Sequence, residues 1–484
     1  MPLQIYNSLS QKKEKFIPNR PDQVSIYVCG PTVYSETHVG HGKTYTGFDV
    51  ILRYFQFLGY KTFYVQNITD VGHLVDDSDD GEDKILKKSR EANKEPMAIA
   101  EYYAGSYFSL MDALGLQRPD ISPRASGHIP EQLEAIEKMV DQGSAYEVNG
   151  SIYFDISRDP SYGRLSNRSQ EDMLSGTRVG IRSEKRNPND FALWKHAEKG
   201  HLMRWKDPWG GFGYPGWHTE CVVMSSKYLG DQFDIHGGGM DLKFPHHESE
   251  LAQARSLGQS FAKYWMHSNM LTINGQKMSK SLGNYVTLAE ACQTHGALAI
   301  RYFILASHYR SVVDYSESSI QNAKLSLLRL HQITGALRQQ LSDQVTPGHQ
   351  HFQEYRQRFC EAMDDDFATP QALAVLFELT KEANSLLNES SPNPEAIADA
   401  EYLFSTLGGE VLGVIPQTLE QESETGEKMD QVMQLVIQLR KRFRENKDFA
   451  ASDFIRDQLH QIGIQLEDGK EGTSWKLFRN EALR

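Results

Sequence analysis

The sequence predicts an α/β protein built on a parallel sheet, and three consecutive segments near its start support that prediction. Residues Val24–Cys29 are mostly β-branched or aromatic and end at a Gly-Pro pair, which is typical of a buried strand followed by a loop. Apolar residues then recur at helical spacing from Phe48 to Leu58, and a glycine follows where a C-terminal cap belongs. A second strand is expected at Lys61–Asn67. Strand, helix and strand in succession form a βαβ unit, which favours a Rossmann-like, nucleotide-binding sheet.

The rest of the chain changes character twice. Residues 116–200 mix helix-like and strand-like pieces without the βαβ rhythm, so we expect an inserted connective subdomain. The sheet is expected to resume near Gly213. From Tyr285 the chain is mainly helical, with apolar stripes at Ile320–Leu341 and Gln371–Leu387.

Composition limits the class of protein. Hydrophobic residues make up 39% and charged residues 24%, as in ordinary soluble globular proteins. No apolar run reaches the roughly 18 residues of a spanning helix, and Met1–Phe16 lacks the apolar region of a secretory signal, so we expect a cytoplasmic protein without membrane association. The 4 cysteines are too few for a disulfide scaffold. The formal charge of −13 argues against a globally basic nucleic-acid binder but permits a local basic patch.

The segment Asp70–Asp83 carries seven acids and no Lys or Arg. Its stretch Asp76–Gly81 faintly resembles a calcium loop, but Lys87 stands where the closing glutamate is required. We interpret the segment as a solvated loop.

The first motif with chemical potential is His38-Val-Gly-His41, between the first strand and the first helix. At a helix N-terminus beyond a parallel strand, two imidazoles can both reach a bound phosphate, and neighbouring glycines allow the backbone to approach it. Two exposed loop histidines are the alternative interpretation. A Walker A loop and a dinucleotide-binding fingerprint both fail, because Thr37 and Tyr45 occupy positions that require glycine.

The second motif is Lys277-Met-Ser-Lys-Ser281. A flexible loop that presents Lys277 and Lys280 suits transient stabilisation of charge on a transferring phosphate. Taken alone, these residues could form a solvated loop. Their combination with His38 and His41 makes a chance occurrence improbable.

A third group of residues could bind a metal. His246 and Glu250 are four residues apart, on one face of a helix that the preceding proline could begin. Cys29 and Cys221 lie close to the sheet motifs, and two thiolates, an imidazole and a carboxylate form a plausible zinc shell. No CxxC pair is present, so buried cysteines and a surface His/Glu pair remain the alternative on spacing alone. The segment His247–Leu251 lacks the second histidine of a zinc-protease motif.

The first two motifs resemble the HIGH and KMSKS signatures of class I aminoacyl-tRNA synthetases, with Val39 as a variation in the first. The chain as a whole is similar to the cysteinyl-tRNA synthetases nearly end to end. The matching stretches are Tyr27–Tyr34, Gly216–Cys221, Phe233–Gly239, Phe244–Glu250, Ile455–Leu459 and Gly472–Trp475. The acidic insertion after Thr69 departs from shorter forms of the family.

The resemblance implies ATP-dependent activation of L-cysteine to cysteinyl-adenylate and transfer to the 3′-terminal ribose of tRNA(Cys). It implies one Zn²⁺ per chain, with Mg²⁺ accompanying ATP, and a monomer is expected. The implied zinc ligands are Cys29, Cys221, His246 and Glu250. A zinc–sulfur bond would select cysteine over serine, near-isosteres that a shape pocket separates only about 10²-fold.

The resemblance also assigns roles to single residues. The implied catalytic groups are His38, His41, Lys277 and Lys280. The implied ATP contacts are His38, His41, His236, Gly237, Gly238 and Lys280. The implied substrate contacts are Cys29, Gly30, Thr69 and Trp217, for which a plain core tryptophan is the alternative.

The tail carries a basic run from Arg440 to Lys447 on a helix expected over Met433–Ile462. Such a helix could contact tRNA phosphates, although a solvated face is the common case. Trp475 and Phe478 are candidate stacking platforms for unpaired bases.

Polar stretches at Ser390–Pro394 and Gln417–Gly426 mark candidate domain boundaries. The expected order is the first half of the catalytic domain (1–115), the connective subdomain (116–200), the second half with the zinc site (201–270), the KMSKS loop and stem-contact helices (271–345), a helical anticodon-binding domain (346–416) and a small C-terminal module (427–484).

Two rival functions follow from the same residues. A related ligase forms cysteinyl-adenylate and joins it to an amino sugar, but that family lacks an anticodon domain, and the helical region after about residue 320 favours tRNA. A catalytically silent RNA-binding paralogue is the second rival. The intact histidines, lysines and presumptive metal ligands argue against it.

Overall fold

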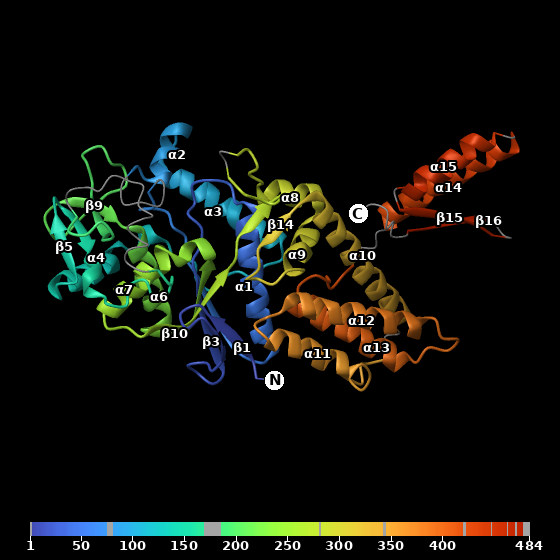
Figure 1. Ribbon diagram of the computed structural model, residues 1–484, viewed down its shortest axis with the longest axis horizontal. Helices are drawn as coiled ribbons and strands as arrows, with labels where there is room; N and C mark the ends of the chain where they lie inside the picture. The colour runs from blue at the N-terminus through green and yellow to red at the C-terminus, as the bar shows by residue number, and fades with distance from the viewer. Residues whose placement is uncertain are drawn as a thin grey trace. The chain divides into compact units, whose positions relative to one another are not determined.

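The computed structural model describes residues 2–74, 81–168, 185–279, 282–341, 345–419, 423–446, 448–461, 463–469 and 472–477. The chain forms two compact units, Met1–Pro416 and Gln417–Arg484 (Figure 1). Over the described ranges, no helix combines the length and apolar character that crossing a membrane requires.

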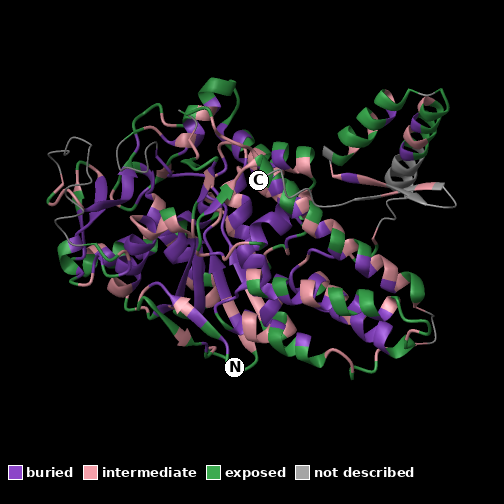
Figure 2. Ribbon diagram, turned by 45° about the vertical axis from the view of Figure 1, so that its right-hand side comes forward, coloured by how far each residue is buried: buried purple, intermediate pink, exposed green. Residues whose placement is uncertain are grey.

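A four-stranded parallel sheet lies at the centre of the first unit, in the order β11-β10-β3-β4. Its strands are β3 (Gln23–Val28), β4 (Lys61–Gln66), β10 (Gln232–Gly239) and β11 (Phe261–Ser268). Helix α1 (Val39–Phe57) connects β3 to β4, which confirms the predicted βαβ unit. Figure 2 shows the sheet and α1 as the buried interior of this unit. Burial on both faces accounts for the continuous apolar runs of the strands.

A hairpin precedes the βαβ unit, and two helices follow it. Strands β1 (Gln4–Asn7) and β2 (Lys12–Lys15) form an antiparallel hairpin. Helices α2 (Lys84–Ala92) and α3 (Pro96–Ala113) follow β4.

The expectation of a solvated loop at Asp70–Asp83 is wrong at both ends of that segment. Asp70 is buried and accepts hydrogen bonds from the backbone N–H and hydroxyl of Ser126, at 2.8 and 2.6 Å. Asp83 is buried, caps α2 by accepting from the N–H of Ile85 and Leu86, and accepts a third bond from Gly72. Acidic side chains therefore serve as local acceptors here. The calcium-like stretch lies largely in 75–80, outside the described residues.

The inserted segment forms an antiparallel sheet of its own, in the order β5-β6-β7-β9-β8. Its elements are α4 (Ile129–Asp141), β5 (Ala145–Val148), β6 (Ser151–Phe154), β7 (Phe191–His196), β8 (Trp205–Lys206) and β9 (Phe212–Pro215). The expectation that the parallel sheet resumes near Gly213 is wrong, because β9 pairs with β7. A Cβ on Gly213 would lie 2.1 Å from the indole nitrogen of Trp194, so this glycine permits close packing inside the insertion.

Helices and a small sheet complete the first unit. Helices α6 (Trp217–Leu229) and α7 (His246–Ser256) flank β10 in sequence. Strands β12 (Leu271–Ile273), β13 (Gln276–Lys277) and β14 (Val313–Tyr315) form the small sheet. The later helices are α8 (Leu288–His295), α9 (Ala297–Leu305), α10 (Glu317–Gln340), α11 (Gln353–Asp364), α12 (Thr369–Leu387), α13 (Pro394–Leu403) and a π-helix at Phe404–Val411. The predicted stripes correspond to α10 and α12.

The second unit contains two helices and a hairpin: α14 (Ser423–Glu445), α15 (Phe449–Gln461), β15 (Ile464–Gly469) and β16 (Gly472–Leu477). The single helix expected over Met433–Ile462 is therefore wrong. Asp448 begins the second helix, because its side chain accepts a hydrogen bond from the N–H of Ala451 at 3.1 Å. Lys447 and Phe478 lie outside the described residues, and Trp475 lies in β16.

A buried ion pair joins α1 to the later helices. The guanidinium of Arg301 in α9 contacts the Asp49 carboxylate at 2.5 Å and donates to the carbonyls of Leu114 and Leu412. Neither charged side chain is more than 2% exposed. Each charge is therefore stabilised mainly by its protein partners.

Replacing Asp49 by Asn should lower the free energy of unfolding of the first unit by about 3–5 kcal/mol, because the buried guanidinium loses its counter-charge. Chemical denaturation measures the change. The matched control is Glu378→Gln, the same exchange of a carboxylate for an amide in the exposed Arg358–Glu378 pair. Solvent screening predicts that this variant changes the free energy of unfolding little. Equal effects of the two variants would contradict this account.

Candidate active site and metal centre

A cavity of about 410 Å³ opens at the carboxyl ends of the parallel strands. The end of β3 contributes Cys29, the start of α1 contributes His38 and His41, and the end of β4 leads to Thr69. This is the edge at which open α/β sheets bind ligands. The volume lies in the range of small-molecule sites.

The two histidines of the first motif organise the start of α1. Backbone N–H of Gly40 donates to Nδ1 of His38 at 3.1 Å, and backbone N–H of His38 donates to Nδ1 of His41 at 3.4 Å. The rings stack with centroids 3.7 Å apart. Burial, followed by the nearby His38, lowers the pKa of His41 well below its ordinary value. His41 is therefore neutral, and since its Nδ1 accepts, we assign its proton to Nε2, where it can be donated to an anion.

The fold brings the segment that follows the second motif against the start of α1. The N–H of Val39 donates to the carbonyl of Val286 at 3.3 Å, and the N–H of Leu288 donates to the carbonyl of Thr37 at 2.8 Å. Lys277 lies on β13, is exposed and lines the cavity with His38 and His41. Lys280 lies outside the described residues.

The four predicted metal ligands meet at the inner end of the cavity. Sγ of Cys29 lies 3.8 Å from Sγ of Cys221 and 3.6 Å from Oε1 of Glu250. Nε2 of His246 lies 3.0 Å from the same Oε1. The four donor atoms all lie within 4.8 Å of one another. Donors about 2.3 Å from one ion, in a tetrahedral arrangement, are about 3.8 Å apart, so the cluster fits a single zinc ion.

The pKa values of Cys29, Cys221 and His246 are shifted so that each side chain is neutral near pH 7. Burial, followed by the contact with Cys221, holds the pKa of the Cys29 thiol well above its usual value. Burial raises the pKa of Cys221 to about 12. Burial, followed by the nearby His218, lowers the pKa of His246. A dication would reverse the preference of the thiols, because it stabilises their thiolate forms.

A second set of possible donors shares two of these residues. Cys29 and Glu250 also lie near His236 and His247, with Nε2 of His247 at 3.3 Å from Cys29 Sγ and Nε2 of His236 at 2.7 Å from Glu250 Oε2. Cys29, Cys221 and His246 line the cavity, whereas His236 and His247 are not among its lining residues. The first set therefore faces the space that a substrate can enter.

The residues predicted to contact the nucleotide through the glycine run lie beside the cavity, in β10. His236 is fully buried, and Gly237 and Gly238 are not among the residues that line the cavity. A Cβ on Gly237 would lie 2.3 Å from the ring of Phe48, and one on Gly238 would approach Leu242 and His247. These glycines make room for protein side chains, and Gly239 is the member of the run that reaches the cavity.

Trp217 forms one wall of the cavity and stacks between two histidines. Its centroid lies 3.8 Å from that of His73 and 4.3 Å from that of His246. Gly30 and Thr69 also line the cavity, and the Thr69 hydroxyl donates to the buried carboxylate of Glu220. His73 also lines the cavity, although it lies in the acidic segment that was expected to be a solvated loop; the apolar Val71 and Leu74 on either side of it are the signal of burial.

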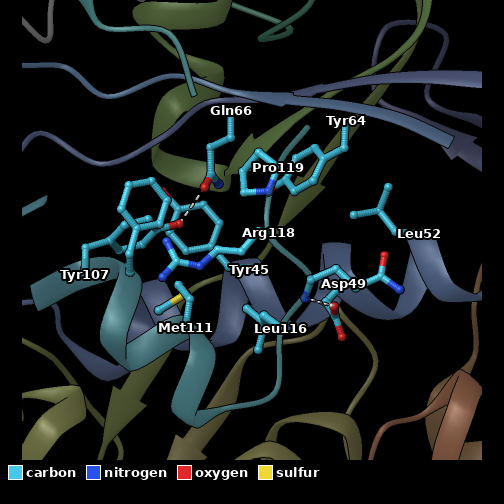
Figure 3. Close-up of a pocket in the computed structure, with 12 residues that line it drawn as sticks. Tyr45, Asp49, Leu52, Tyr64, Gln66, Tyr107, Met111, Leu116, Arg118 and Pro119 are labelled. Atoms are coloured by element: carbon cyan, nitrogen blue, oxygen red, sulfur yellow. Dashed lines mark hydrogen bonds between the residues drawn. The ribbon is translucent and has the colours of Figure 1, made fainter. Parts of the chain in front are cut away.

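Tyr45 also lines a second, much smaller cavity of about 10 Å³, beside Tyr64, Gln66 and Tyr107 (Figure 3). The hydroxyl of Tyr107 donates to Oε1 of Gln66 at 2.6 Å. This space is sufficient for about one water molecule. It offers no room for a substrate.

Comparison with known proteins identifies the class. Residues 15–325 match the sequence model for the "tRNA synthetases class I (C) catalytic domain", and residues 358–416 match that for the "DALR domain". The fold and the site are thus those of a class I aminoacyl-tRNA synthetase. A methionyl-tRNA synthetase of Mycobacterium tuberculosis, solved with methionyl-adenylate, has a similar fold, with a TM-score of 0.60 and 15% identity over 82% of this chain and 92% of that one.

Relatives of known name narrow the family. A protein named cysteine–tRNA ligase from Chlorobium chlorochromatii is 50% identical over 99% of this chain and 100% of its own length. One of the same name from Thermus thermophilus is 46% identical over 99% of this chain and 100% of its own length. The chain belongs to the cysteine–tRNA ligase family.

Binding of a divalent metal at Cys29 and Cys221 should release two protons per ion near neutral pH, because both thiols are protonated below their raised pKa values. Affinity should therefore rise with pH, by up to about 100-fold per unit. Calorimetry in buffers of different ionisation enthalpy counts the protons. Cys221→Ser should release one fewer, and Cys360→Ser, which removes a thiol outside the cluster, should release the same number as the unaltered protein. Proton release that is independent of Cys221 would argue against this ligand set.

Proposed function

We propose that the chain activates L-cysteine with ATP and transfers it to the 3′-terminal ribose of tRNA(Cys). One observation carries the proposal: a cluster of sulfur, nitrogen and oxygen donors opens into the same cavity as His38, His41 and Lys277. The cluster could hold a metal ion that binds a substrate thiol, and the three cationic or proton-donating side chains can bind phosphates. Their juxtaposition fits an amino acid that carries sulfur and is joined to a nucleotide.

The reaction has two steps. The cysteine carboxylate attacks the α-phosphate of ATP, the new oxygen–phosphorus bond forms, and pyrophosphate leaves. A hydroxyl of the tRNA's terminal ribose then attacks the adenylate carbonyl, and AMP leaves. His38, His41, Lys277 and Lys280 act by positioning the phosphates and offsetting the charge that develops on them. Mg²⁺ enters with ATP.

The residue set fits zinc as the metal. Cys29, Cys221, His246 and Glu250 would hold the ion, which when bound supplies a bond to the substrate sulfur that serine cannot match. The orientation of this set toward the cavity favours it over the set that contains His236 and His247. Trp217, stacked on His246, limits the space beside the sulfur. Gly30 and Thr69 contact the rest of the amino acid.

Contacts with tRNA are proposed for the helical domain and the second unit. Lys441, Arg442 and Arg444 are exposed on α14 and suit contacts with phosphates. Arg440, in the same basic run, is only 3% exposed. A cytoplasmic monomer completes the proposal.

Exchange of labelled pyrophosphate into ATP tests the proposal directly. We expect exchange that requires cysteine and does not proceed with serine, and we expect labelled cysteine to be attached to tRNA(Cys). Exchange with cysteine but without tRNA charging would support the amino-sugar ligase. Absence of exchange would support a silent paralogue.

The selector role of the metal site has its own test. Cys221→Ser should reduce bound zinc and raise the KM for cysteine far more than the KM for ATP, because the substrate sulfur loses its partner. In the cobalt-loaded protein, addition of cysteine should increase the thiolate-to-cobalt absorption, and addition of serine should leave it unchanged. Equal losses for cysteine and ATP, together with an unchanged cobalt spectrum, would remove the selector role.

A further inference from the structure

Lys43, two residues after His41, is enclosed in the interior of the first unit. Its side chain is 2% exposed, and its ammonium donates to three uncharged oxygens. These are the carbonyl of Asn269 at 2.6 Å, the carbonyl of Tyr309 at 2.9 Å and the hydroxyl of Ser268 at 3.3 Å. Burial lowers the pKa of Lys43 to about 7. Burying an ammonium without a counter-charge costs free energy. Lys43 is therefore of interest for the three groups that it holds in place.

The oxygens that Lys43 binds stand at the root of the hairpin that carries Lys277. Ser268 ends β11, and both it and Asn269 line the cavity. The chain continues from Asn269 into β12, whose Thr272 is paired with Lys277 of β13. Because β12 and β13 form one short hairpin, holding Asn269 fixes the base from which Lys277 reaches the cavity.

Tyr309 connects the same point to the helical domain. While its carbonyl accepts from Lys43, its hydroxyl donates to Oδ1 of Asp366 at 2.8 Å. The neighbouring Arg310 donates to Oδ2 of Asp366 at 2.6 Å. Asp366 is fully buried between α11 and α12, within the segment that matches the DALR domain. A single residue thus touches α1 through its backbone and the helical domain through its side chain.

We propose that Lys43 is a positioning residue for adenylate formation, acting through Asn269 and Tyr309 to hold the Lys277 hairpin against α1 and to tie it to Asp366. This inference rests on the proposed function. A shift of Asp366 would reach Lys43 through two hydrogen bonds and the backbone of Tyr309, and would reach Asn269, at the base of the Lys277 hairpin, through a third. The cysteine side, on β3, α6 and α7, lies outside this connection.

The chain offers a matched control for the link through Tyr309. Tyr54 of α1 is also fully buried, and its hydroxyl donates to Asp364 at 2.8 Å. It therefore joins α1 to the helical domain by the same chemistry. Its hydroxyl bonds to the carboxylate of Asp364 and the carbonyl of Cys360, so it acts on neither Lys43 nor Asn269 directly.

Cysteine-dependent pyrophosphate exchange by the full chain tests the proposal. Lys43→Met should lower the kcat of exchange by about tenfold or more while the KM for cysteine stays within about twofold, because only the phosphate side is displaced. Tyr309→Phe should lower kcat by about threefold or more, and Tyr54→Phe by less than about twofold, although both should lower Tm similarly. The kcat of the double variant Lys43→Met/Tyr309→Phe should be within about twofold of the kcat of Lys43→Met, since the two residues act in one connection.

The outcomes separate this inference from the proposed function. Failure of the unaltered protein to exchange with cysteine would refute the function itself. An active unaltered protein with an equally fast Lys43→Met variant would refute the positioning role, as would a rise in the cysteine KM that matches the fall in kcat. Should Lys43→Met fail to fold, Tyr309→Phe decides, because it keeps the carbonyl that Lys43 binds. Equal slowing by Tyr309→Phe and Tyr54→Phe would then overturn the inference.

Discussion

The parallel pairing of β3 with β10 is the constraint on which the site depends. Ile26 lies opposite Ile235 in this ladder, and the N–H of Cys29 donates to the carbonyl of Gly237 at 2.9 Å. Helices α6 and α7, before and after β10, bring the other three donors to the end of β3. The donors come from three separate elements, so their convergence reflects the register of one pair of strands. The antiparallel insertion leaves that register undisturbed.

The side chains of the donor cluster can be buried because most of them are neutral in the absence of an ion. Cys29, Cys221 and Glu250 lie in the interior, where isolated charges are costly. Burial favours neutral thiols and a neutral His246, so the polypeptide can enclose these groups before an ion arrives. A metal ion that binds there would exchange protons for a dication in a site that is already assembled. The rings of His73 and His246, which both stack on Trp217, line the cavity beside that site.

The sequence was informative where local patterns decide structure and uninformative where packing decides it. Strand–helix–strand periodicity predicted the core of the sheet, since each element signals itself within a few residues. The run at Gly237 does not by itself indicate its role, because in the sequence a glycine that admits a ligand looks the same as one that admits Phe48. Gly213 was assigned to the wrong sheet because a four-residue strand does not indicate its partner. The convergence of Cys29 with Cys221 followed from family resemblance, since no short spacing links them.

The insertion between β4 and β10 has a consequence for folding during synthesis. Strand β3 and its partner β4 emerge from the ribosome early, but the other partner of β3, β10, follows only about 200 residues after β3, which at 5–20 residues per second corresponds to roughly 10–40 s. Throughout that interval one edge of β3 has exposed backbone donors and acceptors, which can pair with strands of other nascent chains. This edge of β3 is therefore one route to aggregation of the protein during its synthesis.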